Sequence, residues 1–147
     1  KTHFGMSFNR KKPRLRGGYY IHIAPGDSFL AAGFWNPNKE DLFRIRKEME
    51  MDAEEFRTLL QDPVFTKAWG GLEGEEVKTA PKGFSKEHPN IDLIKKKQYL
   101  FIKKLDDKAI LADNFQTEVI QHFNAIRPIF NYFSSVLTTD LNGVSIL

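Results

Sequence analysis

The strongest constraint on the fold lies near the C-terminus, where seven large apolar residues recur at helical spacing. Successive members lie 4, 4, 3, 4, 3 and 4 residues apart: Phe115, Val119, Phe123, Ile126, Phe130, Phe133 and Leu137. Spacings of three and four place side chains on one face of an α-helix. We therefore expect a long C-terminal amphipathic helix that lays this stripe on a core, with a kink at Pro128, where a backbone donor is missing.

The N-terminal part of the chain alternates instead between apolar and small or polar residues, which is typical of half-buried strands. This pattern predicts strands over residues 3–8, 19–23 and 28–35. The Pro25-Gly26-Asp27 turn and the short connections favour an antiparallel meander. A fourth strand is expected over residues 98–104, which are rich in β-forming side chains.

Helix-start signals fill the region between the third and fourth strands. Asn36 as a cap with Pro37 at the first helical position predicts one helix, Asp52 caps a second, and Asp62-Pro63 begins a short third. A further short helix is expected over residues 91–94. Together the elements predict an α+β fold, with an antiparallel sheet and helices packed mainly on one face.

Composition limits the class of protein. The chain has 147 residues, a formal net charge of +3 and no cysteine, which excludes disulfides, a thiol nucleophile and thiolate zinc sites. The length and the lack of a linker predict a single α+β domain over residues 1–147. No apolar run is long enough to span a membrane, and a reducing, cytoplasmic location is the default expectation.

The usual motifs for phosphate, dinucleotide and serine-hydrolase chemistry are absent. The histidines His3, His22, His88 and His122 share no metal-ligand spacing, so we expect no metal site and no cofactor. His122 is interpreted as a structural or solvated residue beside the buried stripe.

His22 lies in the middle of a predicted strand, on the face opposite its aliphatic neighbours and beside Tyr20. This arrangement fits an ordinary polar outer face. It also fits a cleft in which a histidine donates or accepts a proton, with Ser28 as a possible third member.

A stiffened loop over residues 80–89 carries two prolines, Lys82 and His88. Functional side chains often lie on such loops. The alternative is a structural connector whose Phe84 fills a gap in the core.

A basic run spans Arg10–Arg16, with five cations in seven residues: Arg10, Lys11, Lys12, Arg14 and Arg16. Residues 1–26 contain six Lys or Arg and no Asp or Glu. Clustered cations suit nucleic-acid phosphates, another anionic surface or a partner protein, and they also suit a solvated hairpin loop.

Two stretches carry a family resemblance. They are Gly18-Tyr19-Tyr20-Ile21-His22-Ile23-Ala24-Pro25-Gly26-Asp27-Ser28-Phe29, followed by Gly33, Leu42 and Ile45-Arg46, and Pro81-Lys82-Gly83-Phe84 with His88-Pro89. The chain resembles a widespread microbial family of conserved hypothetical proteins, catalogued only as a domain of unknown function. The likeness runs from Lys1 to roughly Tyr132.

This resemblance implies an α+β fold and an intracellular protein that corresponds to the C-terminal two-thirds of such a sequence. An N-terminal helical part of the same domain would precede it. The resemblance implies no reaction, substrate or cofactor, so no catalytic role is carried over.

Three hypotheses about function follow. The first is a binding module for an anionic small molecule or partner, with candidate site residues Tyr20, His22, Ser28, Arg46, Lys82 and His88. The alternative is an acid–base or hydrolytic enzyme that uses His22 or His88. A second alternative is nucleic-acid binding through Arg10–Arg16. Whether the protein is an enzyme is left open.

Overall fold

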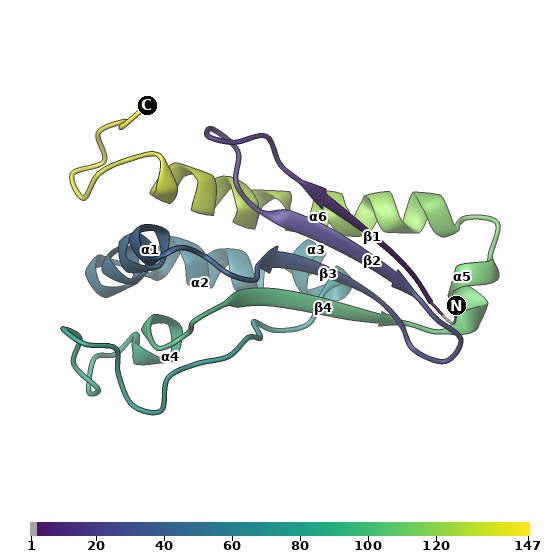
Figure 1. The fold of residues 1–147 in the computed structure, drawn as a ribbon, viewed down its shortest axis with the longest axis horizontal. Coiled ribbons are helices and arrows are strands. Elements are labelled where there is room, and N and C mark those ends of the chain that lie inside the picture. Colours follow the sequence, from purple (N-terminus) through teal and green to yellow (C-terminus); the bar gives the residue numbers. More distant parts are fainter. Residues whose placement is uncertain (1–2) are drawn as a thin grey trace.

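The structure is a computed structural model that describes residues 3–147. A twisted four-stranded sheet lies across one layer and helices pack behind it (Figure 1). The elements follow the order β1 (Phe4–Asn9), β2 (Gly18–Ile23), β3 (Ser28–Phe34), α1 (Lys39–Met51), α2 (Glu54–Gln61), α3 (Pro63–Ala68), α4 (Ile91–Ile94), β4 (Tyr99–Leu105), α5 (Asp107–Leu111) and α6 (Phe115–Leu137). The predicted α+β class is confirmed.

The sheet has the strand order β1-β2-β3-β4, and every neighbouring pair is antiparallel. The register places Phe8 opposite Tyr19, Tyr19 opposite Ala32 and Ala32 opposite Phe101. Because residues directly opposite one another share a face, these four side chains point to the helical side. Tyr20 and His22, one residue out of phase, belong to the outer face.

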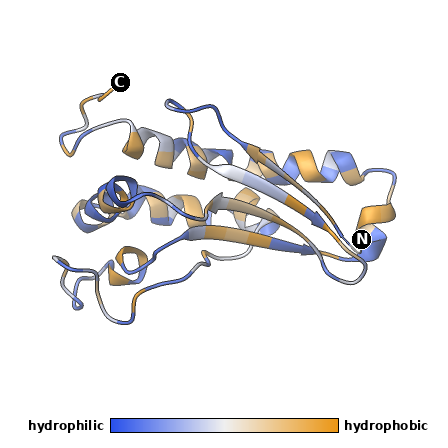
Figure 2. Ribbon diagram, in the orientation of Figure 1, coloured by the Kyte–Doolittle hydropathy of each residue, from blue (hydrophilic) through white to orange (hydrophobic). Residues whose placement is uncertain are grey.

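The predicted stripe of α6 forms the centre of the core. Ile126, Phe130 and Phe133 are fully buried, and Phe34 of β3 meets the rings of Phe130 and Phe133 edge-on. Figure 2 shows apolar and polar residues alternating along α6, as expected for an amphipathic helix. The assigned helix continues through Pro128.

Helices α1, α2 and α3 pack against α6 and complete the helical layer. Trp69, which follows α3, donates its indole N–H to the backbone oxygen of His122 over 2.8 Å. Phe56 of α2 packs against the rings of Tyr132 and Phe133. These contacts join α2 and the end of α3 to α6 in one core.

Two helix starts differ from the sequence prediction. The expected start of α1 at Asn36 and Pro37 is wrong, because Asn38 is the N-cap and its side chain accepts from the Asp41 N–H over 2.8 Å. Helix α2 begins after Ala53, one residue later than predicted, although the Asp52 carboxylate still accepts from the Glu54 N–H. At the start of α1 two good capping residues, Asn36 and Asn38, competed for one helix end.

Helix α5 was not predicted. The Asp106 carboxylate accepts from the Ala109 N–H over 2.7 Å and caps this helix. Within residues 3–147, no helix has the length and apolar character needed to cross a membrane.

Candidate functional site

Tyr20 and His22 lie together on the outer face of the sheet. The Tyr20 hydroxyl is 3.1 Å from Nδ1 of His22, and the His22 ring stacks between His3 and Phe29, with centroids 5.1 and 4.8 Å away. The three stacked rings come from the residue before β1, from β2 and from β3. The pair is adjacent, as strand alternation predicted.

Ser28 lies on the opposite face and closes the turn between β2 and β3. Its hydroxyl donates to the Ala24 carbonyl and accepts from the Ala24 N–H, both over 3.0 Å, and the residue is buried. The structure therefore does not bring Ser28 to His22.

Arg46 and the 80–89 loop occupy a third region. The Arg46 guanidinium donates to the backbone oxygens of Ile94 and Lys96 over 2.8 and 2.9 Å, and burial lowers its pKa. Lys82 is exposed, and Nδ1 of His88 accepts from the Asn90 N–H over 3.0 Å. The six predicted site residues thus fall into separate places, and their role in binding stays a prediction.

The acid–base hypothesis needs a histidine next to a carboxylate or Ser28. Among the hydrogen bonds of residues 3–147, His22 meets Tyr20 and His88 meets the Asn90 backbone. Neither ring is oriented by an acidic side chain in this part of the chain. No group of three His, Asp or Glu suited to a metal ion occurs within the described residues.

The basic run divides into two kinds of side chain. Arg10 donates to Asn131 of α6 over 2.8 Å, and Arg16 forms an ion pair with Asp41 of α1. In addition, the Arg16 backbone N–H donates to the Ser134 hydroxyl over 2.9 Å. Lys11, Lys12 and Arg14 are exposed. They belong to the loop that joins β1 and β2, whose path Figure 1 shows.

A cavity of about 410 Å³, here called the basic pocket, lies between residues 9–18 and residues 33–41. Arg10, Lys12 and Arg16 line one side, and the segment that leads into α1 lines the other, with Trp35 and Asn38. The pocket therefore joins the basic loop to the start of the first long helix.

Glycines make room for this pocket. A Cβ on Gly18 would lie 2.8 Å from Oδ1 of Asn9 and 3.3 Å from the Trp35 ring. Gly33 has φ +140°, and a Cβ there would overlap the Tyr99 carbonyl oxygen. A larger residue at Gly18 would push against Asn9 and Trp35, and one at Gly33 would force β3 away from β4.

The electrostatics of the basic pocket favour a negative ligand. The charged lining consists of three cations and the Asp41 carboxylate, which leaves an excess of two positive charges. Nε of Arg16 is buried and has no hydrogen-bond partner among the described residues. Burial lowers the pKa of Arg10, yet a guanidinium stays charged at neutral pH. The N-terminal end of α1 adds a partial positive charge.

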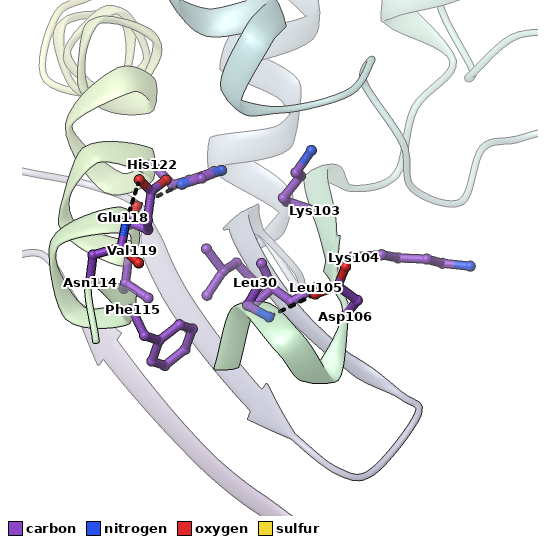
Figure 3. A pocket seen from close by; sticks show the side chains of 11 residues that line it. Leu30, Lys103, Lys104, Leu105, Asp106, Asn114, Phe115, Glu118, Val119 and His122 are labelled. Carbon is purple, nitrogen blue, oxygen red and sulfur yellow. Dashed lines mark hydrogen bonds between the residues drawn. The ribbon is translucent and has the colours of Figure 1, made fainter. Parts of the chain in front are cut away.

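A second cavity, of about 420 Å³, lies between β4, α5 and α6 (Figure 3). Its charged and titratable side chains are mixed: Lys103 comes from β4, whereas Glu118 and His122 come from α6. Nδ1 of His122 donates to the Glu118 backbone oxygen over 2.7 Å, which orients the ring. Two lysines, Lys103 and Lys104, are balanced by the carboxylates of Asp106 and Glu118, so this cavity has no excess of positive charge to attract an anion.

Sequence reasoning identified the cations of the basic pocket but missed Trp35, Asn38, Asp41 and Gly33 as its other walls. An isolated glycine inside a strand often marks a close backbone approach, so Gly33 carried a usable signal. The sequence contains no signal for the pairing of Arg16 with Asp41, because the tertiary fold alone brings these two residues together.

The sequence matches one family of known proteins. A family model described as "Conserved hypothetical protein (DUF2461)" matches residues 1–132, the span over which the resemblance was predicted. No curated protein matches the chain, and no solved structure matches it either.

Proposed function

We propose that this chain, which belongs to the family of conserved hypothetical proteins DUF2461, is a binding module for a small anionic ligand held in the basic pocket. The observation that carries the proposal is the convergence of Arg10, Lys12 and Arg16 on one cavity. The anion is thereby assigned to the basic loop and not to the candidate residues proposed from the sequence, which were Tyr20, His22, Ser28, Arg46, Lys82 and His88.

The donors suit carboxylate or phosphate groups. A guanidinium presents a planar fork of N–H donors to two oxygens at once, and a lysine supplies a mobile point charge. The Nε of Arg16, which meets no acceptor within residues 3–147, is a donor that a ligand oxygen would satisfy. The Asp41 carboxylate is paired with Arg16 and would compete with a weak anion.

The size of the cavity suits a small molecule. Ligand pockets commonly enclose about 300–1,000 Å³, and the basic pocket lies near the lower end of that range. Trp35 forms part of the wall, so a ligand with a planar apolar portion beside its anionic group would fit best.

Isothermal titration with inorganic phosphate and pyrophosphate at low ionic strength tests the proposal. Lys12→Ala should weaken binding about threefold to tenfold, since a charge-assisted contact contributes roughly 1 kcal/mol at a partly exposed site. Lys11→Ala is the matched control, because Lys11 is an exposed neighbour that does not line the pocket. Absence of binding, or an equal loss in both variants, would contradict the proposal.

Nucleic-acid binding gives a different result in the same variants. Nucleic-acid phosphates bound along an exposed loop would lose similar affinity when Lys11, Lys12 or Arg14 is replaced, and that affinity would depend steeply on salt concentration.

A cytoplasmic location and a single domain over residues 1–147 belong to this proposal. They are supported by the lack of cysteine and by one core cluster that joins the sheet to the helices.

A further inference from the structure

The hydroxyl group of Tyr132, on α6, is buried without a partner. The residue is 7% exposed, and within residues 3–147 its hydroxyl oxygen meets no hydrogen-bond donor or acceptor. The ring is held in place, because it stacks on Phe56 with centroids 5.5 Å apart and meets Phe133 edge-on. Buried hydroxyl groups are nearly always hydrogen-bonded, so this exception calls for a physical reason.

Tyr132 lines a cavity of about 240 Å³, here called the acidic pocket. The pocket lies between α1, α2, the end of α6 and the segment that follows α6, with Arg44, Glu55 and Leu141 among its walls. None of its lining residues lines the basic pocket. Figure 1 shows α1 and the end of α6 at one end of the molecule and the start of β1 at the other.

The charged lining of the acidic pocket has an excess of one negative charge, since it consists of Arg44, Glu48 and Glu55. The Arg44 guanidinium pairs with the Glu48 carboxylate over 2.8 Å and donates to the backbone oxygens of Thr139 and Asp140 over 3.0 and 2.9 Å. Glu55 is exposed and forms no ion pair within residues 3–147. Its carboxylate is therefore the charge that a ligand would meet.

Two helix ends add to the negative potential of the acidic pocket. Met51 ends α1, and Ser135 and Val136 lie in the last turn of α6. The carbonyl end of a helix carries a partial negative charge, which a basic side chain often balances. Neither of these last turns contains a basic residue. At the start of α2, the partial positive charge meets two carboxylates in the same turn, Glu54 and Glu55.

The Tyr132 hydroxyl lies within this potential. Burial raises the pKa of Tyr132, and the carboxylates of Glu48, Glu55 and Asp52 raise it further, against the opposing effect of Arg44. The hydroxyl is thus neutral at physiological pH, and its oxygen can accept a hydrogen bond. An anionic ligand would be repelled here, whereas a positively charged donor would be attracted.

We propose that the acidic pocket binds a small primary alkylammonium ion. Its N–H groups would donate to the Tyr132 hydroxyl and to the Glu55 carboxylate, and its alkyl chain would contact Met51, Val136 and Leu141. The cavity has room for roughly eight water-sized groups, which limits the ligand to a short chain. Because the hydroxyl is shielded from water, the ligand would reach it by displacing exposed lining side chains such as Met51. This inference is independent of the basic pocket and its ligand.

Mapping of backbone amide chemical shifts during titration with n-butylammonium chloride tests the proposal, with sodium chloride at equal ionic strength as the reference. A ligand of this size should bind with a dissociation constant on the order of 1 mM. We expect saturable shifts at Met51, Ser135 and Gly143, which line the pocket. n-Butanol lacks the charge and tetramethylammonium lacks N–H donors, so each should bind at least about threefold more weakly.

Two variants test the residues that carry the proposal. Tyr132→Phe removes only the hydroxyl and should weaken the binding of n-butylammonium at least about threefold. Glu55→Gln removes the exposed carboxylate and should weaken it about threefold as well. Glu54→Gln is the matched control and should bind normally, because Glu54 is an exposed neighbour on α2 that does not line the pocket.

Three results would overturn the proposal: no saturable shifts up to about 100 mM ligand, equal affinity for n-butanol or tetramethylammonium, or an equal loss in the Glu54 and Glu55 variants. Nα-acetyl-lysine amide carries the same ammonium group on a peptide backbone and should bind no more tightly than n-butylammonium, because the cavity is small. Tighter binding of the lysine derivative would assign the pocket to a side chain of a partner protein and contradict a small-molecule ligand.

Discussion

The Arg16 guanidinium forms an ion pair with the Asp41 carboxylate, which joins the loop after β1 to the first turn of α1. Both side chains are more than four-fifths buried. The pair therefore fixes one wall of the basic pocket and partly neutralises it. Its two roles, structural and electrostatic, can be separated by substitution.

Replacement of Asp41 tests this electrostatic role. Asp41→Asn removes one negative charge from the pocket and should raise the affinity for inorganic phosphate about fivefold, as roughly 1 kcal/mol is expected for a charge near 4 Å in water. The free energy of unfolding should fall by about 1 kcal/mol, because the ion pair is lost. Glu40→Gln, an exposed change in the same turn, is the control for titration calorimetry. Equal or weaker binding by the Asp41 variant would argue against an anion in this pocket.

Gly33 allows close contact between β3 and β4 beside the pocket. Gly33→Ala should lower the free energy of unfolding by about 2–4 kcal/mol, since it combines a positive φ with overlap of the Tyr99 oxygen. Gly70→Ala should change it by less than about 1 kcal/mol, because a Cβ there meets open space. Urea denaturation compares the two variants, and similar stabilities would refute the packing argument.

Removal of the hydroxyl group should have different effects on stability at two buried tyrosines. Burial raises the pKa of both Tyr99 and Tyr132, but only Tyr99 donates to a partner, the Leu93 oxygen at 2.9 Å. The Tyr132 hydroxyl has no hydrogen-bond partner among the described residues. Tyr99→Phe should therefore cost about 1–2 kcal/mol, whereas Tyr132→Phe should be neutral or stabilising. Thermal denaturation at neutral pH measures both, and a larger loss in the Tyr132 variant would contradict this assignment.

The Arg57–Asp92 pair predicts a pH-dependent contribution to stability. The hydrogen bonds from Arg57 lower the pKa of Asp92 and outweigh the opposing effect of burial. A carboxylate with a depressed native pKa stabilises the fold above its unfolded pKa of about 3.9, and this contribution disappears as the pH falls through the native value. Asp92→Asn should cost less than about 1 kcal/mol at neutral pH, because the pair is partly exposed.

Urea denaturation of this variant and the unmodified chain should give converging stabilities as the solution is acidified below the native pKa. Asp113→Asn, an exposed carboxylate after α5, is the matched control. A difference that persists or grows in acid would show that the Asp92 effect is not electrostatic.

The elements predicted correctly are those in which apolar residues recur at a regular spacing along the sequence. The helical stripe of α6 and the alternation in β2 follow from burial of one face, so their signals run through several residues. Helix α5 was missed because it is short and its only strong signal is one capping carboxylate, Asp106. The start of α1 was misplaced because Asn36 and Asn38 are both good caps, and only local geometry chooses between them.

The candidate site was less predictable. The run Arg10–Arg16 is visible in the sequence, but the inward direction of Arg10 depends on Asn131, which lies 121 residues away. Conversely, Tyr20 and His22 lie together as predicted, whereas the Arg46 guanidinium donates hydrogen bonds to backbone carbonyls near α4. Residue types indicated possible chemistry, and long-range packing determined which of them share a cavity.

Anion binding in the basic pocket can be located by mapping backbone amide chemical shifts during titration with inorganic phosphate. We expect saturable shifts concentrated at Gly17, Gly18 and Asn38, which line the basic pocket. Lys12→Ala should reduce the affinity derived from these shifts, whereas Lys11→Ala should not. Saturable shifts centred on Lys103 and His122, or no saturable shifts at all, would contradict it.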